Sequence, residues 1–325
     1  MDEHGGNLDL AVRLYGGTYE DWIDLSTGIN PYPYSFGNIP ERAWSCLPTA
    51  HEIGNLERIA GIAYGVSDLL TVAISGAQTA IQMIPLLRSQ GLVRVLSPTY
   101  SEHATAFKNS GWKVENVSTL EELNGADVGV VVNPNNPDGR HHQPLELLNI
   151  SSSIGILLVD ESFCDLYPEL SVAPLITDQS ESIIVLRSFG KFYGLAGLRL
   201  GFALSGKNNI DNLRQLAGPW PVSGPAISVA SIALADREWR TKTLKRINYE
   251  SAKLDQLANQ SGLKLVGGTL LFRTYKTDRM NEIKKQLIQQ RIWARFFQDY
   301  PDWIRLGLPA KPEHWHRVRR ALVEK

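Results

Sequence analysis

Residues 188–201 read SFGKFYGLAGLRLG, and this stretch decides how the rest of the chain is interpreted. It places Lys191 in a glycine-rich turn directly after an apolar run, and Arg199 follows eight residues later. A lysine amine condenses with aldehydes when burial or nearby cations lower its pKa. An arginine fork suits a phosphate dianion, and glycines let the backbone approach a ligand closely. The stretch therefore predicts a nucleophilic lysine beside an anion site, with an ordinary surface loop as the alternative.

Short apolar runs alternate with helical periods on both sides of this stretch. The runs are rich in Val, Ile and Leu along their whole length, which is typical of strands buried on both faces of a mostly parallel sheet. Helices are expected over 77–90 and 101–109, each followed by a terminating glycine. The sequence thus predicts an α/β fold, whose strands are expected at 71–74, 93–96, 128–132, 156–159, 183–186 and 200–204.

The chain changes character after Pro225. A long amphipathic stretch at about 227–260 precedes short β-like runs and one more helix, a pattern typical of a small α+β domain. The runs are 263–266, 269–274, 292–296 and 303–308, and the helix is 279–291. Glycines and prolines in the first 40 residues favour an extended arm. We therefore expect an N-terminal arm (1–40), a large domain (41–225) and a small C-terminal domain (226–325).

The composition argues against several classes of function. Lys plus Arg (33) nearly balances Asp plus Glu (34), so no overall field directs the chain to nucleic acid or an anionic membrane. Cys46 and Cys164 form no disulfide framework, and the adjacent His141 and His142 lack partners at metal-ligand spacing. The N-terminal residues do not resemble a secretory signal, and we find no apolar run of about 18 residues. We expect a cytoplasmic protein that binds no metal, nucleic acid or membrane.

Further polar segments follow the predicted strands. The segment SGAQ at 75–78 lies between a strand and a helix, where free N–H groups and the helix dipole favour a phosphate; a simple serine cap is the alternative. SPTY at 97–100 and NPNNPDG at 133–139 also follow strands, although such pairs form turns in any case. Asp160 closes a strand, and Arg305 lies in an alternating strand near the C-terminus.

Together with residues 188–201, these segments resemble the fold-type I enzymes that depend on pyridoxal 5′-phosphate (PLP), the aspartate aminotransferase superfamily that includes histidinol-phosphate aminotransferases. The resemblance implies a large domain with a mostly parallel sheet, a small α+β domain, and PLP as the cofactor. It assigns catalysis to Lys191 and Asp160. The residues that it assigns to the cofactor are Tyr64, Gly76, Ala77, Gln78, Tyr100, Asn136, Asp160, Ser188, Lys191 and Arg199.

The resemblance also implies individual roles. Lys191 would hold the cofactor through a Schiff base, Asp160 would pair with the pyridinium nitrogen, and Asn136 would donate to the phenolate oxygen. Tyr100 would stack on the ring. Tyr64 would reach the phosphate of the neighbouring subunit's PLP, which implies a homodimer; the end of an amphipathic helix is the alternative for this residue.

Two positions depart from the family pattern. Many aminotransferases have a tyrosine three residues after the aspartate, where this chain has Phe163, and often a serine before the lysine, where it has Gly190. Loss of a hydrogen bond to an anionic oxygen corresponds to about 1.5–3 kcal/mol. Ordinary transamination therefore does not follow from the resemblance.

Segments near the N-terminus favour one of the possible reactions over the others. HGGN at 4–7 and WIDLSTGINP at 22–31, with DESF at 160–163 and PWPV at 219–222, resemble the L-threonine-O-3-phosphate decarboxylases. These enzymes supply (R)-1-aminopropan-2-yl phosphate for cobalamin. The resemblance implies a phosphorylated amino acid as substrate, bound by His4, Gly5, Asn30, Arg295 and Arg305.

Other functions stay open at this point. An aminotransferase acting on a phosphorylated substrate such as histidinol phosphate would use the same residues, and a regulator or scaffold with the PLP fold would use none of them for turnover. Association with another enzyme of the cobalamin pathway is also compatible with the sequence.

Overall fold

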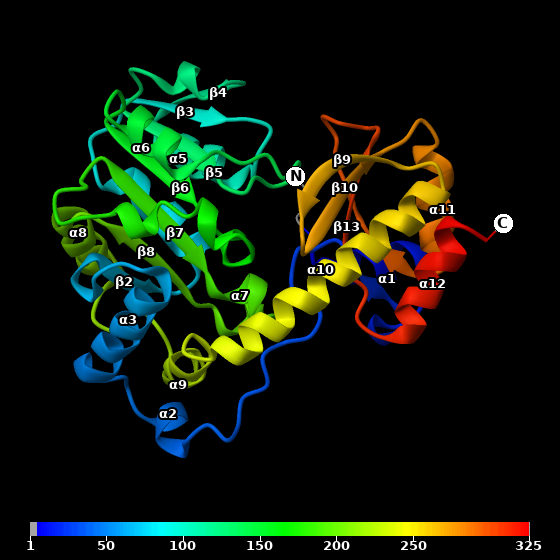
Figure 1. Ribbon diagram of the computed structural model, residues 1–325, viewed down its shortest axis with the longest axis horizontal. Helices are drawn as coiled ribbons and strands as arrows, with labels where there is room; N and C mark the ends of the chain where they lie inside the picture. The colour runs from blue at the N-terminus through cyan, green and yellow to red at the C-terminus, as the bar shows by residue number, and fades with distance from the viewer. Residues whose placement is uncertain (1–4, 325) are drawn as a thin grey trace. The chain divides into compact units, whose positions relative to one another are not determined.

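The computed structural model describes residues 5–324, which divide into two compact units. The central unit is Tyr34–Arg240. The terminal unit combines the described parts of Met1–Pro33 and Thr241–Lys325. Figure 1 shows the elements of both, and each unit is described by itself. The predicted arm and domain boundaries after residues 40 and 225 stay predictions.

A seven-stranded sheet forms the middle of the central unit, in the order β2-β8-β7-β6-β5-β3-β4. Only β8 runs against its neighbours, because both of its pairings are antiparallel and all other pairings are parallel. The carboxyl ends of β2, β3, β5, β6 and β7 therefore share one edge. The strands are β2 (Thr71–Ile74), β3 (Leu92–Leu96), β4 (Lys113–Val117), β5 (Val128–Val132), β6 (Ile156–Asp160), β7 (Ile183–Ser188) and β8 (Gly201–Ser205).

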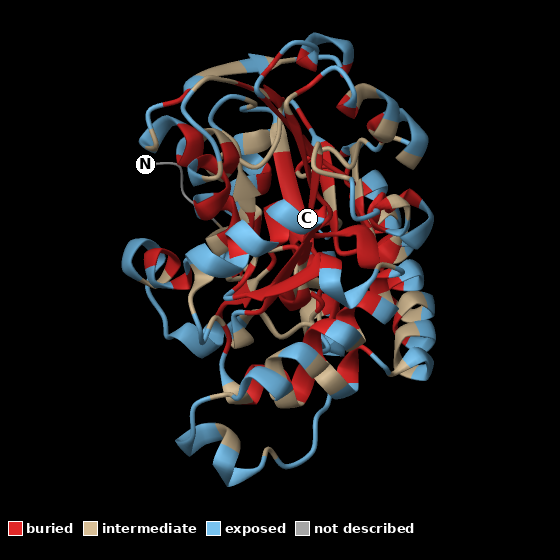
Figure 2. Cartoon of the chain, turned by 90° about the vertical axis from the view of Figure 1, so that its left-hand side faces the viewer, coloured by how far each residue is buried: buried red, intermediate tan, exposed pale blue. Residues whose placement is uncertain are grey.

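Helices cover this sheet, and its central strands β5 and β6 are buried at every residue. Figure 2 shows these buried strands in red beneath helices that carry exposed residues. Phe107 and Trp112 pack at 5.2 Å between ring centroids within the core on one face. The helices are α2 (Glu41–Ser45), α3 (Ala50–Tyr64), α4 (Ala77–Met83), α5 (Glu102–Asn109), α6 (Pro144–Ser151), α7 (Phe189–Phe192), α8 (Lys207–Ala217) and α9 (Gly224–Ala233).

The terminal unit is built around a four-stranded antiparallel sheet in the order β12-β13-β10-β9. A second, two-stranded sheet pairs β1 (Ile23–Asp24) with β11 (Ile292–Trp293) in parallel. The remaining strands are β9 (Lys264–Thr269), β10 (Phe272–Lys276), β12 (Arg295–Phe296) and β13 (Trp303–Gly307). The helices are α1 (Leu8–Tyr15), α10 (Arg237–Gln260), α11 (Met280–Gln289) and α12 (Pro312–Leu322); the unit boundary after Arg240 falls in the first turn of α10.

The structure confirms the predicted α/β class and has strands at the predicted runs, but the run 292–296 forms two short strands, β11 and β12, in different sheets. Strand β4 was not predicted, because it is a sheet edge with no fully buried residue. Strand β1 was also not predicted. The helix expected over 77–90 ends at Met83 and continues as a 3-10 turn at Ile84–Leu86, because Pro85 cannot donate a backbone hydrogen bond. The stretch 227–260 forms two helices, α9 and α10, rather than one.

The first 40 residues are not extended throughout. Helix α1 forms because Leu8 and Ala11 pack with Trp22, and Asn7 caps it by accepting a hydrogen bond from the Leu10 N–H at 3.2 Å. None of the helices in the described part of the chain combines the length and apolar composition needed to span a membrane.

Candidate active site

The predicted cofactor residues of the central unit gather at one edge of its sheet. Ser75 follows β2, Ser97 follows β3 and Asn133 follows β5, while Asp160 closes β6 and Ser188 closes β7. These strands point the same way, so their carboxyl ends meet at this edge, which is where open α/β sheets bind ligands.

An anion cradle lies between β2 and α4. Gly76 has a φ of 84°, and a Cβ atom there would lie 2.8 Å from Nη2 of Arg199. A Cβ at Gly201 would lie 2.6 Å from the backbone nitrogen of Ala77. The first N–H groups of a helix have no partner within it and attract anions. The structure therefore brings Arg199, Gly76 and Ala77 together in an arrangement suited to a phosphate.

A hydrogen bond joins Gln78 of the segment 75–78 to Tyr100 of the segment 97–100. The Tyr100 hydroxyl donates to Oε1 of Gln78 at 3.2 Å, and Nε2 of Gln78 donates to Glu102 at 2.9 Å. Because its side chain is engaged in these contacts, Gln78 can contribute its backbone N–H to an anion at the α4 N-terminus. Tyr100 is fixed at the same time.

Asn135 ties together the loops that carry Tyr100 and Asn136. Its Oδ1 accepts from the Thr99 hydroxyl at 2.6 Å, and its Nδ2 donates to the Pro98 carbonyl at 2.7 Å. Nδ2 also donates to Asp138 within its own loop at 2.7 Å. Asn136 is therefore held in a loop that is cross-linked to the neighbouring strand end.

Asp160 is buried and paired with a histidine that the sequence analysis missed. Its Oδ2 lies 2.9 Å from Nε2 of His103, and its Oδ1 accepts from the N–H and hydroxyl of Ser162 at 2.9 and 2.5 Å. Burial acts to raise the pKa of Asp160, but the His103 hydrogen bond and charge and the Ser162 donors outweigh it, so the pKa is lowered. The available signal was a histidine in the first turn of the helix after Tyr100.

Lys191 lies in the short helix α7, next to the aromatic side chain that replaces the expected tyrosine. Its Nζ is 5.7 Å from the centroid of the Phe163 ring, and Phe163 is buried. An aromatic face attracts a cation at this distance but offers no hydroxyl. Lys191 therefore has an apolar ring on the side where many aminotransferases would have a phenol.

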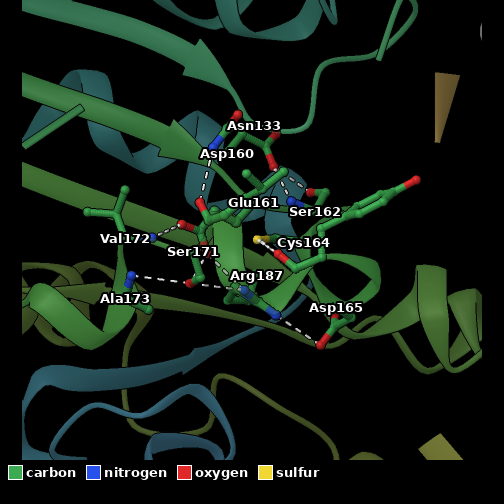
Figure 3. A network of polar contacts seen from close by, with 12 residues as sticks. Asn133, Asp160, Glu161, Ser162, Cys164, Asp165, Ser171, Val172, Ala173 and Arg187 are labelled. Atoms are coloured by element: carbon green, nitrogen blue, oxygen red, sulfur yellow. Dashed lines mark hydrogen bonds and ion pairs between the residues drawn. The ribbon is translucent and has the colours of Figure 1, made fainter. Parts of the chain in front are cut away.

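A buried ion network joins Glu161, the residue after Asp160, to Arg187, the residue before Ser188, and Figure 3 shows Glu161 and Arg187 within it. Arg187 donates to Glu161 at 2.8 Å and to Asp165 at 2.9 Å, and all three side chains are almost fully buried. Glu161 also accepts from the Ser171 hydroxyl at 2.6 Å. Since Glu161 follows Asp160 and Arg187 precedes Ser188, the network fixes the ends of β6 and β7. No sequence motif predicted this network.

Tyr64 is buried against this network. The guanidinium carbon of Arg187 lies 4.4 Å from its ring centroid, and the ring of Phe202 packs at 5.7 Å. Its hydroxyl is buried without a hydrogen-bond partner among the described residues, and burial raises its pKa. The predicted contact of Tyr64 with a partner subunit's cofactor stays a prediction, and it would require this hydroxyl to become accessible.

Most of the predicted substrate residues lie in the terminal unit. Arg295 and Arg305 are directly opposite each other on β12 and β13, so both side chains start from the same face of that sheet. Nη2 of Arg305 donates to the Ser26 carbonyl at 2.6 Å. The two arginines therefore start from neighbouring positions on one face of the sheet. His4 lies outside the described residues.

Asn30 and Gly5 are held by neighbouring segments of the same unit. Asn30 is buried, and its Oδ1 accepts from Arg246 at 2.9 Å and from the Tyr32 N–H at 3.1 Å. Gly5 lies so close to Ser26 that an added Cβ would be 2.5 Å from the Ser26 carbonyl oxygen. Both residues are therefore fixed in place by contacts within the terminal unit.

The groups at the central edge fit PLP. The glycine-lined cradle with Arg199 suits its phosphate, and the buried Asp160 suits a protonated pyridine nitrogen. The amine of Lys191 suits its aldehyde.

The comparisons with known proteins agree with this geometry. Residues 20–321 match the family model "Aminotransferase class I and II". The chain is 42% identical to a threonine-phosphate decarboxylase of Pseudomonas aeruginosa, over 99% of this chain and 98% of that protein. It is 40% identical to another from Sinorhizobium sp, over 98% and 97%. A histidinol-phosphate aminotransferase of Sinorhizobium meliloti, solved in complex with pyridoxal-5′-phosphate, shares the fold, with a TM-score of 0.77 at 20% identity over 85% of this chain and 82% of that one. The fold-type I expectation is thereby confirmed, and the chain belongs to the aminotransferase class I and II family.

Proposed function

We propose that this chain is a PLP-dependent carboxy-lyase that converts L-threonine O-3-phosphate to (R)-1-aminopropan-2-yl phosphate in cobalamin biosynthesis. The observation that carries the proposal is its similarity, over nearly the full length of both chains, to two threonine-phosphate decarboxylases. The lysine, the buried aspartate and the anion cradle at one sheet edge support it, because they suit PLP, the cofactor whose ring accepts the electrons left when an amino acid loses CO2.

The central unit would bind the cofactor. Bound PLP would supply an aldehyde that condenses with the substrate amine and a ring that accepts the electron pair left at Cα when CO2 departs. Asp160, which its partners keep ionised, would hold a proton on the pyridine nitrogen. Lys191 would hold the cofactor and afterwards deliver a proton from Nζ to Cα. Arg199, Ser188 and the α4 N-terminus would bind the phosphate.

The terminal unit would bind the substrate. Arg305 would grip the α-carboxylate through its planar fork, and Arg295 on the opposing strand would bind the substrate phosphate together with Gly5. Asn30, held by Arg246, would add an amide contact. His4 is a further candidate for the phosphate from sequence alone. Two anion contacts in one unit suit an amino acid that carries a phosphate.

The reaction is tested by incubating the PLP-loaded protein with L-threonine O-3-phosphate and measuring released CO2. We expect CO2 in stoichiometric amount with (R)-1-aminopropan-2-yl phosphate. A parallel reaction with histidinol phosphate and 2-oxoglutarate tests the aminotransferase alternative. Turnover of the second pair without CO2 from the first would overturn the proposal, and turnover of neither would favour a regulator or scaffold.

We also propose that the active form is a homodimer. Phe36, Trp44 and Leu47 are apolar but 42%, 68% and 61% exposed, which a second copy covering them would explain. Analytical ultracentrifugation should give twice the chain mass, and Trp44→Glu should shift it toward one chain mass. A single chain mass at high protein concentration would contradict the dimer. Association with another cobalamin-pathway enzyme stays a prediction from the sequence.

A further inference from the structure

The segment after β1 in the terminal unit is fixed on both of its sides. The Leu25 N–H donates to the Trp293 carbonyl at 2.8 Å, and the Leu25 carbonyl accepts from the Gly307 N–H at 2.7 Å. A Cβ at Gly307 would lie 2.4 Å from the Thr27 carbonyl oxygen, so the backbones are in direct contact. The residue between Leu25 and Thr27 therefore has little freedom to move.

That residue, Ser26, is 1% exposed and uses its hydroxyl, its N–H and its carbonyl. Its Oγ accepts from the Gly6 N–H at 2.8 Å and donates to Oδ1 of Asp24 at 2.5 Å. Its own N–H donates to the same Asp24 oxygen at 2.8 Å. Its carbonyl accepts from Nη2 of Arg305 at 2.6 Å. Ser26 therefore joins the N-terminal glycines to Arg305.

Close packing reinforces this junction. An added Cβ at Gly5 would lie 2.5 Å from the same Ser26 carbonyl oxygen that Arg305 contacts. Asp24 accepts both Ser26 hydrogen bonds on one oxygen, which fixes the rotamer of the Ser26 hydroxyl. Gly5 and Arg305 are thus both placed by the same atom, the Ser26 carbonyl oxygen.

We infer that Ser26, oriented by Asp24, is a positioning residue that sets the separation between the phosphate contact at Gly5 and the carboxylate contact at Arg305. The inference rests on the proposed function, in which these two residues bind the two anionic ends of L-threonine O-3-phosphate. A fixed separation selects for substrate length. L-homoserine O-phosphate is an isomer whose phosphate is one carbon further from Cα, and it should fit less well as long as Ser26 holds the junction.

The test compares kcat/KM for these two phosphates in the PLP-loaded full chain. In Ser26→Ala, the preference for the threonine phosphate should fall about five- to tenfold, with a rise in KM and kcat within about twofold, as expected when one hydrogen bond is lost. Asp24→Ala should repeat this result, whereas Asp24→Asn keeps an acceptor and should restore most of the preference.

Ser261→Ala is the matched control. Ser261 is also a buried serine of the terminal unit, and its hydroxyl donates to the Ala258 carbonyl at 2.7 Å, at the end of α10. Its removal should leave the preference unchanged. An unchanged preference in Ser26→Ala, or an equal loss in Ser261→Ala, would overturn the inference. If Ser26→Ala does not fold, Asp24→Ala against Asp24→Asn decides the same question.

Amide hydrogen exchange at Gly6 separates this inference from the proposed function, because it needs no turnover. In the substrate-free protein, Ser26→Ala should speed exchange at Gly6 about tenfold and leave the Leu25 amide unchanged. Absence of turnover of L-threonine O-3-phosphate by the wild type contradicts the proposed function. Unchanged exchange at Gly6 contradicts the inference, whatever the wild type turns over.

Discussion

The central sheet edge and the junction in the terminal unit each contain an aspartate shielded from solvent, Asp160 buried and Asp24 half-buried, but the two are stabilised differently. Asp160 is paired with His103 and Ser162, and these partners lower its pKa in spite of burial. Asp24 has the two Ser26 donors and the charge of Arg305, but burial prevails and raises its pKa. Asp160, with the lowered pKa, is therefore the aspartate that a protonated cofactor nitrogen would need in its ionised form. Asp24, with the raised pKa, orients a serine instead.

The two regions also differ in how far apart in the sequence their residues lie. At the central edge, the groups of the anion cradle, Asp160 and Lys191 lie at or after strands of one sheet, within residues 76–199. In the terminal unit, Ser26 and Arg305 meet although 279 positions separate them. If the proposed roles are correct, substitutions in the first region change cofactor binding, and substitutions in the second change KM while the cofactor stays bound.

The largest effect is expected for Lys191→Ala. Without the amine, borohydride reduction should attach no PLP to the chain, and turnover should fall about 10³-fold or more. Mass spectrometry after reduction and the CO2 assay measure the two effects. Lys207→Ala, which removes an exposed lysine paired with Asp211, is the control and should behave as wild type. Retained covalent PLP in Lys191→Ala would show that the central edge is wrongly assigned.

Next in size is the effect of Arg187→Met on stability. It leaves Glu161 and Asp165 buried without their cation, which should lower the free energy of unfolding by about 3–5 kcal/mol. Urea unfolding measures this change. Arg42→Met removes an exposed pair with Glu52 and should cost far less. Similar losses in both variants would mean that the network does not fix the strand ends behind Asp160.

The strands could be predicted from periodicity, and ligands bind at the carboxyl ends of parallel strands. Lys191 was found from its glycine-rich turn after a predicted strand, and the role of Asp160 came from the family resemblance. His103 left one local signal, its place in the first turn of the helix after Tyr100, whereas nothing local distinguishes the buried Arg187 and Ser26 from surface residues. Their role depends on partners that only the folded chain brings near, such as Arg305 for Ser26.

Arg305→Lys should have an intermediate effect that is confined to the substrate. A lysine keeps the charge but loses the planar fork, so KM for L-threonine O-3-phosphate should rise about 10–100-fold while PLP absorbance is unchanged. Arg279→Lys, a half-exposed arginine of the same unit, is the matched control and should leave KM unchanged. Loss of PLP from Arg305→Lys would break the division between the two regions.

The smallest effect, and the sharpest comparison, is the pH dependence of stability. The pKa of Asp160 is below its ordinary value of 3.8 in the folded chain, so its stabilisation is complete above about pH 4 and is lost as the pH falls further. The pKa of Asp24 is above 3.8, so its contribution declines as the pH rises from about 4 through the folded pKa. Each unit of pKa shift corresponds to about 1.4 kcal/mol.

Calorimetric unfolding midpoints of Asp160→Asn and Asp24→Asn, each compared with wild type between about pH 3 and 7, test these opposite signs. The deficit of Asp160→Asn should grow as the pH rises from 3 to 4 and then stay constant. Asp24→Asn should gain on wild type as the pH rises above 4, because it removes a carboxylate that is costly to ionise where it is buried. If both buried variants change in the same direction, the two regions do not stabilise their carboxylates differently, and the contrast between a firmly ionised cofactor partner and an orienting acceptor fails.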